Sequence, residues 1–222
     1  VEVIEGDFAG GMLIIADHAM RHMPEEYGRL GLPDHEFDRH IAYDIGVEGV
    51  VRHLARLTGA PAVMARYSRL LIDPNRGEDD PTLVRQIYDG AVIPGNYPLY
   101  ADELHRRIET WFRPFRTAVE ETAAAIESRT GAAAMVLSIH SFTPHMGNRP
   151  RPWHIGLLWD RDDRLFNRLF EALKADPALI VGDNEPYDGA LKGDTMHEHA
   201  TAKGRAHVLI EIRQDLIASG AG

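Results

Sequence analysis

The sequence predicts an α/β fold built on a largely parallel sheet. Short apolar runs with the length and β-branched content of buried strands recur along the chain, and amphipathic helical patterns lie between them. This alternation is typical of strands joined by crossover helices. We expect one domain over residues 1–222, because a chain of this length can build one sizeable core and no linker-like stretch divides it.

The predicted elements follow from periodicity. Apolar runs typical of buried strands occupy residues 12–16, 135–139, 155–159 and 208–212, and a weaker fifth run lies at 70–72. Helical patterns cover residues 35–58, 99–129 and 162–175, and residues 215–220 have the start of another. Two stretches rich in Pro and Gly, 74–98 and 143–153, are expected to form long functional loops.

Composition excludes several classes of protein. The net charge is −10 and no Lys/Arg block is present, so we expect no nucleic-acid partner. The absence of cysteine excludes disulfides, thiol nucleophiles and cysteine zinc sites. The first residues lack the pattern of a secretory signal, and no stretch approaches the roughly 18 apolar residues of a membrane span. We therefore expect a cytoplasmic location and no membrane partner.

Three predicted strands end in side chains suited to chemistry. Asp17 and His18 follow the first, His140 and Ser141 end the second, and the last carries Glu211 with Arg213 on the same face. In open α/β sheets the ligand crevice lies outside the carboxyl ends of the strands. The alternative is that these polar residues only mark the surface.

Asp44 is an independent signal. On a helix over residues 35–58 it falls within the apolar face, with His40 towards one edge. A carboxylate facing a core must be paired, hydrogen-bonded or bound to a metal. An ion pair with Arg69 or Arg76 and a role in a metal site both satisfy this requirement.

Two distant histidines, an acidic residue and a separate glutamate are the parts of a catalytic zinc site of the His₂-carboxylate kind. In such a site the metal activates water and a nearby glutamate transfers its proton. The chain has 12 histidines, so chance combinations are many and spacing alone does not decide. A serine hydrolase is excluded, because no G-x-S-x-G elbow is present and adjacent strand residues such as His140 and Ser141 point to opposite faces.

The stretch "YSRLLIDPNR" brings Arg69, Asn75 and Arg76 close together in the sequence. Two guanidinium groups and an amide can form a receptor for an anionic substrate group. An exposed network of ion pairs is the alternative interpretation.

These residues resemble the N-formylglutamate amidohydrolases, relatives of the zinc carboxypeptidases and aspartoacylases. The matching stretches run from residue 17 to residue 217: "DHAMRHMPEEYGRLGLP", "HIAYDIG", "YSRLLIDPNR", "IPGN", "HSFTP", "RPWHIGLLW", "DNEPY" and "IEIRQDLI". The resemblance implies a three-layer α/β/α fold of the phosphorylase/hydrolase-like type with one zinc ion. The implied reaction is hydrolysis of N-formyl-L-glutamate to formate and glutamate, late in histidine degradation.

The resemblance also implies roles for particular residues. His18 and His140 would bind the metal and Glu211 would activate water. Asn75 and Arg76 would bind the substrate carboxylate, and Arg69 would polarise the carbonyl group or bind a second carboxylate. Ser141 and Arg213 complete the predicted substrate-binding residues.

The third metal ligand is not carried by the matching motifs. Zinc carboxypeptidases place an acidic ligand three residues after the first histidine, where this chain has Arg21, and close relatives have Ser-Asn in place of Met20-Arg21. We predict Asp44 as the third ligand; the alternatives are Asp17, His22 and His40.

Two other functions remain open at this point. The same site could act on another N-acyl amino acid, or as a carboxypeptidase. A relative without turnover that binds a metal or an anion is the third possibility. The expected partner is in each case a small anionic molecule, and the sequence does not predict an oligomeric state.

Overall fold

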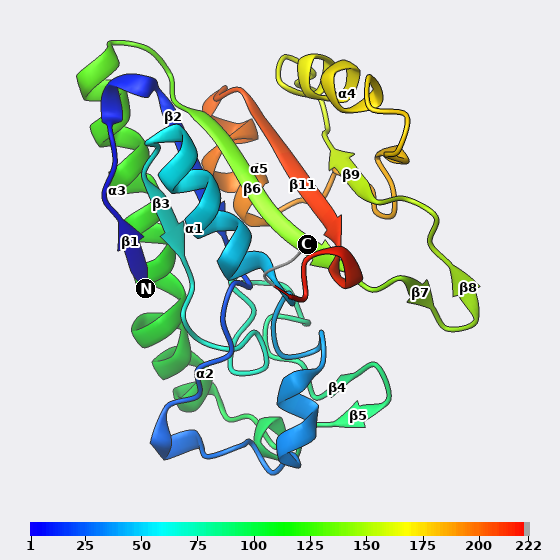
Figure 1. The fold of residues 1–222 in the computed structure, drawn as a ribbon. Helices are drawn as coiled ribbons and strands as arrows, with labels where there is room; N and C mark the ends of the chain where they lie inside the picture. Colours follow the sequence, from blue (N-terminus) through cyan, green and yellow to red (C-terminus); the bar gives the residue numbers. More distant parts are fainter. Residues whose placement is uncertain (220–222) are drawn as a thin grey trace.

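A seven-stranded mixed sheet forms the centre of the computed structural model, which describes residues 1–219 (Figure 1). The strands lie in the order β1-β3-β2-β6-β11-β9-β10. The β1–β3 and β11–β9 pairs are antiparallel and the other neighbours are parallel. The bounds are β1 Glu2–Ile4, β2 Met12–Ala16, β3 Ala62–Met64, β6 Met135–Phe142, β9 Ile155–Leu158, β10 Val181–Asp183 and β11 His207–Arg213.

Helices cover both faces of the sheet. Successive residues of β2 separate into two cores: Leu13 and Ile15 pack with α3 (Arg113–Thr130), whereas Ile14 and Ala16 pack with α1 (Val47–Thr58). Because strand side chains alternate between faces, a strand buried on both sides must be apolar throughout. This explains the continuous apolar runs and confirms the predicted three-layer α/β/α arrangement.

The remaining helices extend the two outer layers. The short helix α5 (Thr195–His199) joins the α3 side, since Met196 belongs to the same core cluster as Phe115. On the opposite end of the sheet, α4 (Phe166–Lys174) packs Phe166 against Leu157 of β9 and Val208 of β11. α4 lies within the predicted 162–175 helix.

The long predicted helix at 99–129 is present as one continuous rod with a local irregularity. It comprises α2 (Ala101–Arg107), a π-helical segment Ile108–Phe112, and α3. Pro114, at the start of α3, has no backbone N–H and so cannot complete the regular hydrogen-bond ladder. Proline and π-bulges are recognised causes of such interruptions.

The helix predicted over 35–58 is wrong in its first half. Residues Asp34–Asp38 form a 3₁₀ turn, and α1 begins only at Val47. Gly46 has φ +85°, a left-handed conformation that ends any continuous helix, and a side chain there would collide with Ile217. Asp44 therefore lies in the turn before α1 and not on a helix.

Two further predictions are corrected. Residues 70–72 form a buried turn and not a strand, because the carbonyls of Leu70 and Leu71 accept hydrogen bonds from the side chains of Asn96 and Arg107. The strand that lies next to β2 on this side of the sheet is β3, which the sequence did not predict. The predicted helix at 215–220 is only the 3₁₀ turn Gln214–Leu216, and residue 220 lies outside the described residues.

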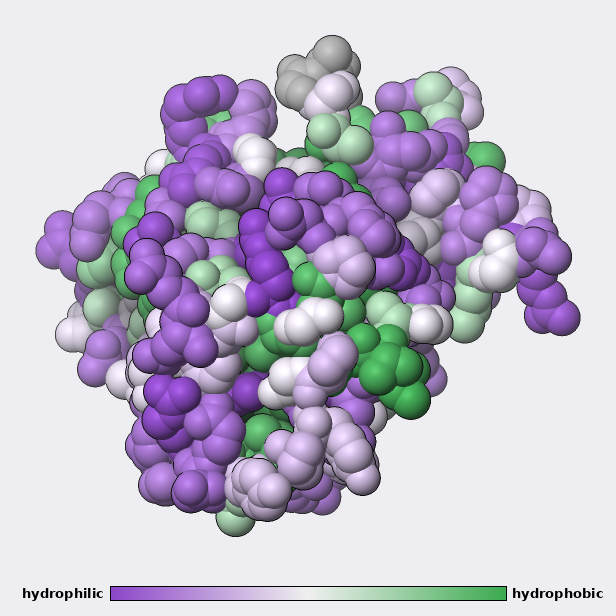
Figure 2. All heavy atoms as spheres, turned by 90° about the horizontal axis from the view of Figure 1, so that it is seen from below, coloured by the Kyte–Doolittle hydropathy of each residue, from purple (hydrophilic) through white to green (hydrophobic). Residues whose placement is uncertain are grey.

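The two long loops carry small hairpins. One pairs β4 (Ile87–Tyr88) with β5 (Ala91–Val92), and the other pairs β7 (His145–Met146) with β8 (Arg149–Pro150). In Figure 1 β6 and β11 point downward, and Figure 2 views this lower face, which is mostly hydrophilic with hydrophobic residues near its middle. Within residues 1–219 no helix has the length and apolar character to cross a membrane.

Candidate active site

A cavity of about 240 Å³ lies at the edge of the sheet where β2, β6 and β11 end. His18 follows β2, His140 is near the end of β6, and Glu211 is on β11. These are the strand ends at which the sequence predicted metal-binding and catalytic side chains. The predicted site residues that line the cavity are His18, Asp44, Arg69, Asn75, Arg76, His140, Ser141 and Glu211.

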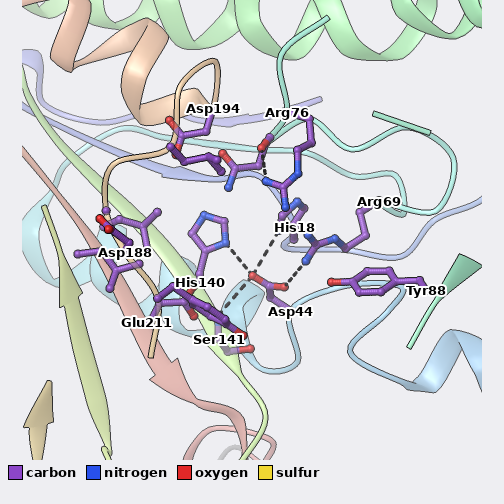
Figure 3. Close-up of a pocket in the computed structure, with 16 residues that line it drawn as sticks. His18, Asp44, Arg69, Arg76, Tyr88, His140, Ser141, Asp188, Asp194 and Glu211 are labelled. Carbon is purple, nitrogen blue, oxygen red and sulfur yellow. Dashed lines mark hydrogen bonds and ion pairs between the residues drawn. The ribbon is translucent and has the colours of Figure 1, made fainter. Parts of the chain in front are cut away.

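Three of these residues converge on one point (Figure 3). The Asp44 N–H donates to the carbonyl oxygen of His18 at 2.8 Å, which holds the turn before α1 against the loop after β2. Asp44 Oδ2 lies 2.8 Å from His140 Nδ1 and 3.5 Å from His18 Nδ1. Within the described residues, these three side chains form a group whose ligand atoms all lie within 4.8 Å of one another.

The far nitrogen of each imidazole is held by a buried carboxylate. His18 Nε2 is 2.7 Å from Asp73 Oδ1, and His140 Nε2 is 3.1 Å from Asp17 Oδ2. Neither Asp73 nor Asp17 is exposed to solvent. Metal-ligating histidines almost always donate their other ring nitrogen to such a partner, which fixes the ring.

This arrangement leaves both Nδ1 atoms facing Asp44. His18 Nδ1 is buried and has no hydrogen-bond partner among residues 1–219, which is costly for a polar atom without a ligand. Two imidazole nitrogens and one carboxylate oxygen are the donor set of a catalytic zinc site. The residues present therefore fit a divalent cation.

Two buried carboxylates of the site have strongly lowered pKa values. Burial raises the pKa of Asp44, but the neighbouring His18 and His140 outweigh this effect and leave that pKa far below its ordinary value. Burial acts likewise on Asp73, and Arg69 with His18 lowers its pKa further than burial raises it. In this structure Arg69 and the imidazoles balance these carboxylates: burial lowers the pKa of His140, but its hydrogen bonds with Asp17 and Asp44 raise it well above its ordinary value. A divalent cation between the same groups would take over this balancing charge.

Glu211 lies beside this cluster on β11. Its register partner on β6 is His140, and its side chain is buried with Oε2 unpaired within the described chain. Burial is the main cause that raises the pKa of Glu211 to about 8, while His140 lowers it and Asp44 raises it. A carboxyl group with a pKa near neutrality is suited to accept and return a proton.

Asp44 was predicted either to pair with an arginine or to belong to a metal site, and its contact with Arg69 shows that both are compatible. Arg69 Nη1 donates to Asp44 Oδ1 at 3.3 Å, and Arg69 Nη2 donates to Asp73 Oδ2 at 3.0 Å. One Asp44 oxygen therefore meets an ion pair while the other faces the histidines (Figure 3). Because its guanidinium already serves two carboxylates, Arg69 chiefly compensates their charge.

Asn75 and Arg76 lie in the loop after Asp73. Asn75 Oδ1 accepts the backbone N–H of Thr195 at 3.0 Å, so its amide NH₂ is the group left to a ligand. Arg76 Nη1 donates to the carbonyl oxygen of Asn75 at 2.8 Å and borders the cavity. This pair supplies hydrogen-bond donors and positive charge next to the histidine cluster.

Other predicted residues have different surroundings. The Ser141 hydroxyl donates to the Ile45 carbonyl at 2.9 Å, so Ser141 secures the Asp44 turn. Arg213 Nε pairs with Asp215 at 2.8 Å, and Arg213 does not line the cavity.

The alternative third ligands are also accounted for. His22 is exposed and its backbone forms a bridge with Tyr67, whereas His40 lies 3.6 Å from Asp89. Asp17 holds His140 from the far side. Arg21 occupies the position at which zinc carboxypeptidases have an acidic ligand. Its side chain donates to the Phe37 carbonyl at 2.7 Å and does not line the cavity.

Several cavity residues were missed by the sequence analysis. Tyr88 comes from the β4–β5 hairpin, and Tyr187, Asp188 and Asp194 come from the segment before α5. Tyr187 lay in the matching stretch "DNEPY" but was given no role. A local capping signal, not used above, is the Asp-Thr pair that starts α5, where the Asp194 side chain accepts the His197 N–H.

Comparisons with known proteins agree with this fold. The chain aligns with a solved structure of a gene product from Agrobacterium tumefaciens at 35% identity and TM-score 0.90, covering 99% of this chain and 87% of that one. It is also similar in fold to an N-formylglutamate amidohydrolase from Ralstonia eutropha, with 23% identity, TM-score 0.67, and coverage of 97% and 86%. No curated protein matched the sequence.

The class that these findings define is an α/β amidohydrolase. The chain belongs to the N-formylglutamate amidohydrolase family, whose sequence model matches residues 10–218. This confirms the family resemblance that the motifs carried.

Proposed function

We propose that the protein hydrolyses the formyl amide of N-formyl-L-glutamate to formate and L-glutamate, with one zinc ion held by His18, Asp44 and His140. The observation that carries this proposal is the convergence of two buried Nδ1 atoms on Asp44, each ring held from behind by a carboxylate. The family match supports the amidohydrolase activity.

A divalent cation supplies Lewis acidity: it polarises a carbonyl group and lowers the pKa of water. Glu211, beside His140, takes a proton from the attacking water and returns it to the leaving amine nitrogen. Its burial favours this exchange, because the protonated and ionised forms are then close in free energy near neutral pH.

Asn75 and Arg76 bind a carboxylate of the substrate and orient the formyl group towards the histidine cluster. Orientation of this kind can contribute several kcal/mol to the lowering of a barrier. The cavity of about 240 Å³ is smaller than the roughly 300–1,000 Å³ of sites for drug-sized ligands. Its size suits a small amino-acid derivative.

One observation favours a second candidate. Asp188 and Asp194 line the same cavity, and burial above all raises the pKa of Asp194 to about 6. Carboxylates on the wall would repel a second substrate carboxylate and accept a donor group instead. An N-acyl amino acid with a neutral or basic side chain is therefore the second candidate substrate.

The test is zinc analysis of the purified protein followed by formate release from N-formyl-L-glutamate, before and after removal of metal by a chelator. We expect about one zinc per chain, activity that chelation abolishes, and recovery on adding zinc. A panel of N-formyl, N-acetyl and N-succinyl derivatives of acidic, neutral and basic amino acids separates the two candidates, which differ in the side chain of the substrate. No amine release from any of them would refute the proposal.

A further inference from the structure

The carboxylates behind the two histidines are joined to each other through the substrate-binding loop. On one side, His18 Nε2 meets Asp73 Oδ1 at 2.7 Å. The same Oδ1 accepts the backbone N–H of Asn75 at 3.0 Å. Asp73 Oδ1 therefore links the His18 ring to the backbone of Asn75, which borders the cavity.

The other side of Asn75 leads to His140. Asn75 Oδ1 accepts the Thr195 N–H at 3.0 Å, and the Thr195 hydroxyl donates to Asp17 Oδ1. Asp17 Oδ2 then meets His140 Nε2 at 3.1 Å. Both histidines also face Asp44: His140 Nδ1 is hydrogen-bonded to Asp44 Oδ2 at 2.8 Å, and His18 Nδ1 lies 3.5 Å from the same oxygen. These hydrogen bonds and the His18–Asp44 contact together form a closed ring, with Asn75 and Thr195 at the point farthest from Asp44.

The ring is buried and its loops are locked together. Thr195, Asp17 and Asp73 have no solvent exposure, and Asn75 is only 8% exposed. In such surroundings hydrogen bonds are stronger than in water and polarise one another, so each link constrains the next.

Arg116 of α3 reinforces the contact between the two loops. Its Nη2 donates to the carbonyls of Pro74, Arg76 and Gly193 at 3.2, 2.8 and 2.9 Å. Gly193 also lies so close to Gly77 that a Cβ on Gly193 would be 3.2 Å from the Gly77 Cα. The loop of Asn75 and the loop of Thr195 are thus held as one unit.

We infer that Asn75 and Thr195 are positioning residues for the cation site, so that a residue of the substrate receptor also sets the affinity for the metal. This inference rests on the proposed function, because it assumes that His18, Asp44 and His140 bind a cation. Asn75 and Thr195 act through Asp73 and Asp17, which hold the two imidazole rings in the orientation that directs Nδ1 towards Asp44.

The Thr195 hydroxyl can be removed with little change of shape. In Thr195→Val the side chain keeps its volume but Asp17 Oδ1 loses its donor, and we expect zinc affinity to fall about 10-fold, as for other changes behind metal ligands. Thr195→Ser keeps the hydroxyl and is expected to restore the affinity. Thr122→Val is the matched control, since the Thr122 hydroxyl donates to the Ala118 carbonyl within α3.

Asn75 and Arg76 provide a second comparison within the substrate receptor. Both border the cavity, but only Asn75 belongs to the ring. Asn75→Ala is expected to weaken zinc binding about 10-fold. Arg76→Gln is not expected to weaken it, because loss of a nearby positive charge favours a cation.

The experiment is a zinc titration of the metal-free full chain against a chromogenic chelator, without substrate, after circular dichroism has verified folding. Zinc binding by the unchanged protein, with Thr195→Val and Asn75→Ala both equal to it, would overturn this inference and leave the proposed function standing. No specific zinc binding by the unchanged protein would overturn both. If Thr195→Val does not fold, Asn75→Ala against Arg76→Gln decides the question.

Discussion

Glu211 and His140 are register partners on the parallel strands β11 and β6, and both side chains are buried at the same edge of the sheet. Paired residues of neighbouring strands point to the same face, so Glu211 lies beside any ligand of His140. The proposed proton-transfer group and one proposed metal ligand are thus positioned by the same backbone hydrogen bonds. Their separation does not depend on a loop.

Glu211→Gln should retain zinc and lose turnover. Glutamine has the size of glutamate but cannot take up a proton, and loss of a general base typically lowers kcat by about 10²–10⁴-fold. The measurements are zinc content and formate release from N-formyl-L-glutamate. A variant with zinc and nearly unchanged kcat would remove Glu211 from the mechanism.

Asp73→Asn should weaken zinc binding by about 10–100-fold, because the charge that holds His18 Nε2 and balances Arg69 is lost. Asp79→Asn is the control, since Asp79 is exposed in the same loop. Chelator competition gives the two affinities. Equal affinities for the two variants would show that the carboxylate behind His18 contributes nothing specific.

Gly46→Ala should destabilise the protein, whereas Gly49→Ala should not. Gly46 has φ +85° and a Cβ there would lie 2.4 Å from the Ile217 carbonyl oxygen, so a cost of about 1–3 kcal/mol is expected. Gly49 is within α1 with open space around it, and alanine there should stabilise the helix by up to about 1 kcal/mol. Denaturant unfolding measures both; equal midpoints would contradict the argument.

Glu120→Gln should destabilise the protein at neutral pH and have progressively less effect in acid. The hydrogen bond from Arg205 is the main cause that lowers the pKa of Glu120 to about 2, below its ordinary 4.5. A depressed carboxyl pKa stabilises the fold above the unfolded value and loses that contribution as the pH falls from about 4.5 to about 2.

The measurement for Glu120 is the melting temperature of variant and unchanged protein between pH 7 and pH 3. The difference between them should shrink below pH 4.5. Glu121→Gln, at the exposed neighbouring position, should show little difference at any pH. A constant gap for Glu120→Gln would exclude the ion pair as its cause.

The sequence by itself determined four of the seven sheet strands, β2, β6, β9 and β11, and the polar side chains at the ends of three of them. The run at 12–16 is apolar throughout, and the run at 135–139 is apolar except for Ser138, because helices cover both faces. A charged or histidine side chain at the end of such a run is therefore conspicuous. His18, His140 and Glu211 were found in this way. These signals are local, because the hydrophobicity of a strand's own residues indicates that it is buried.

Only the tertiary structure decided how the site is assembled. Asp44 was assigned to a helix, but the left-handed Gly46 places it in a turn that reaches both histidines. The partners Asp73 and His18 are 55 positions apart, and Thr195 and Asp17 are 178 apart. Periodicity reports which face of an element is buried; it carries no information on which distant side chain completes a buried hydrogen bond, because that is set by the packing of whole layers.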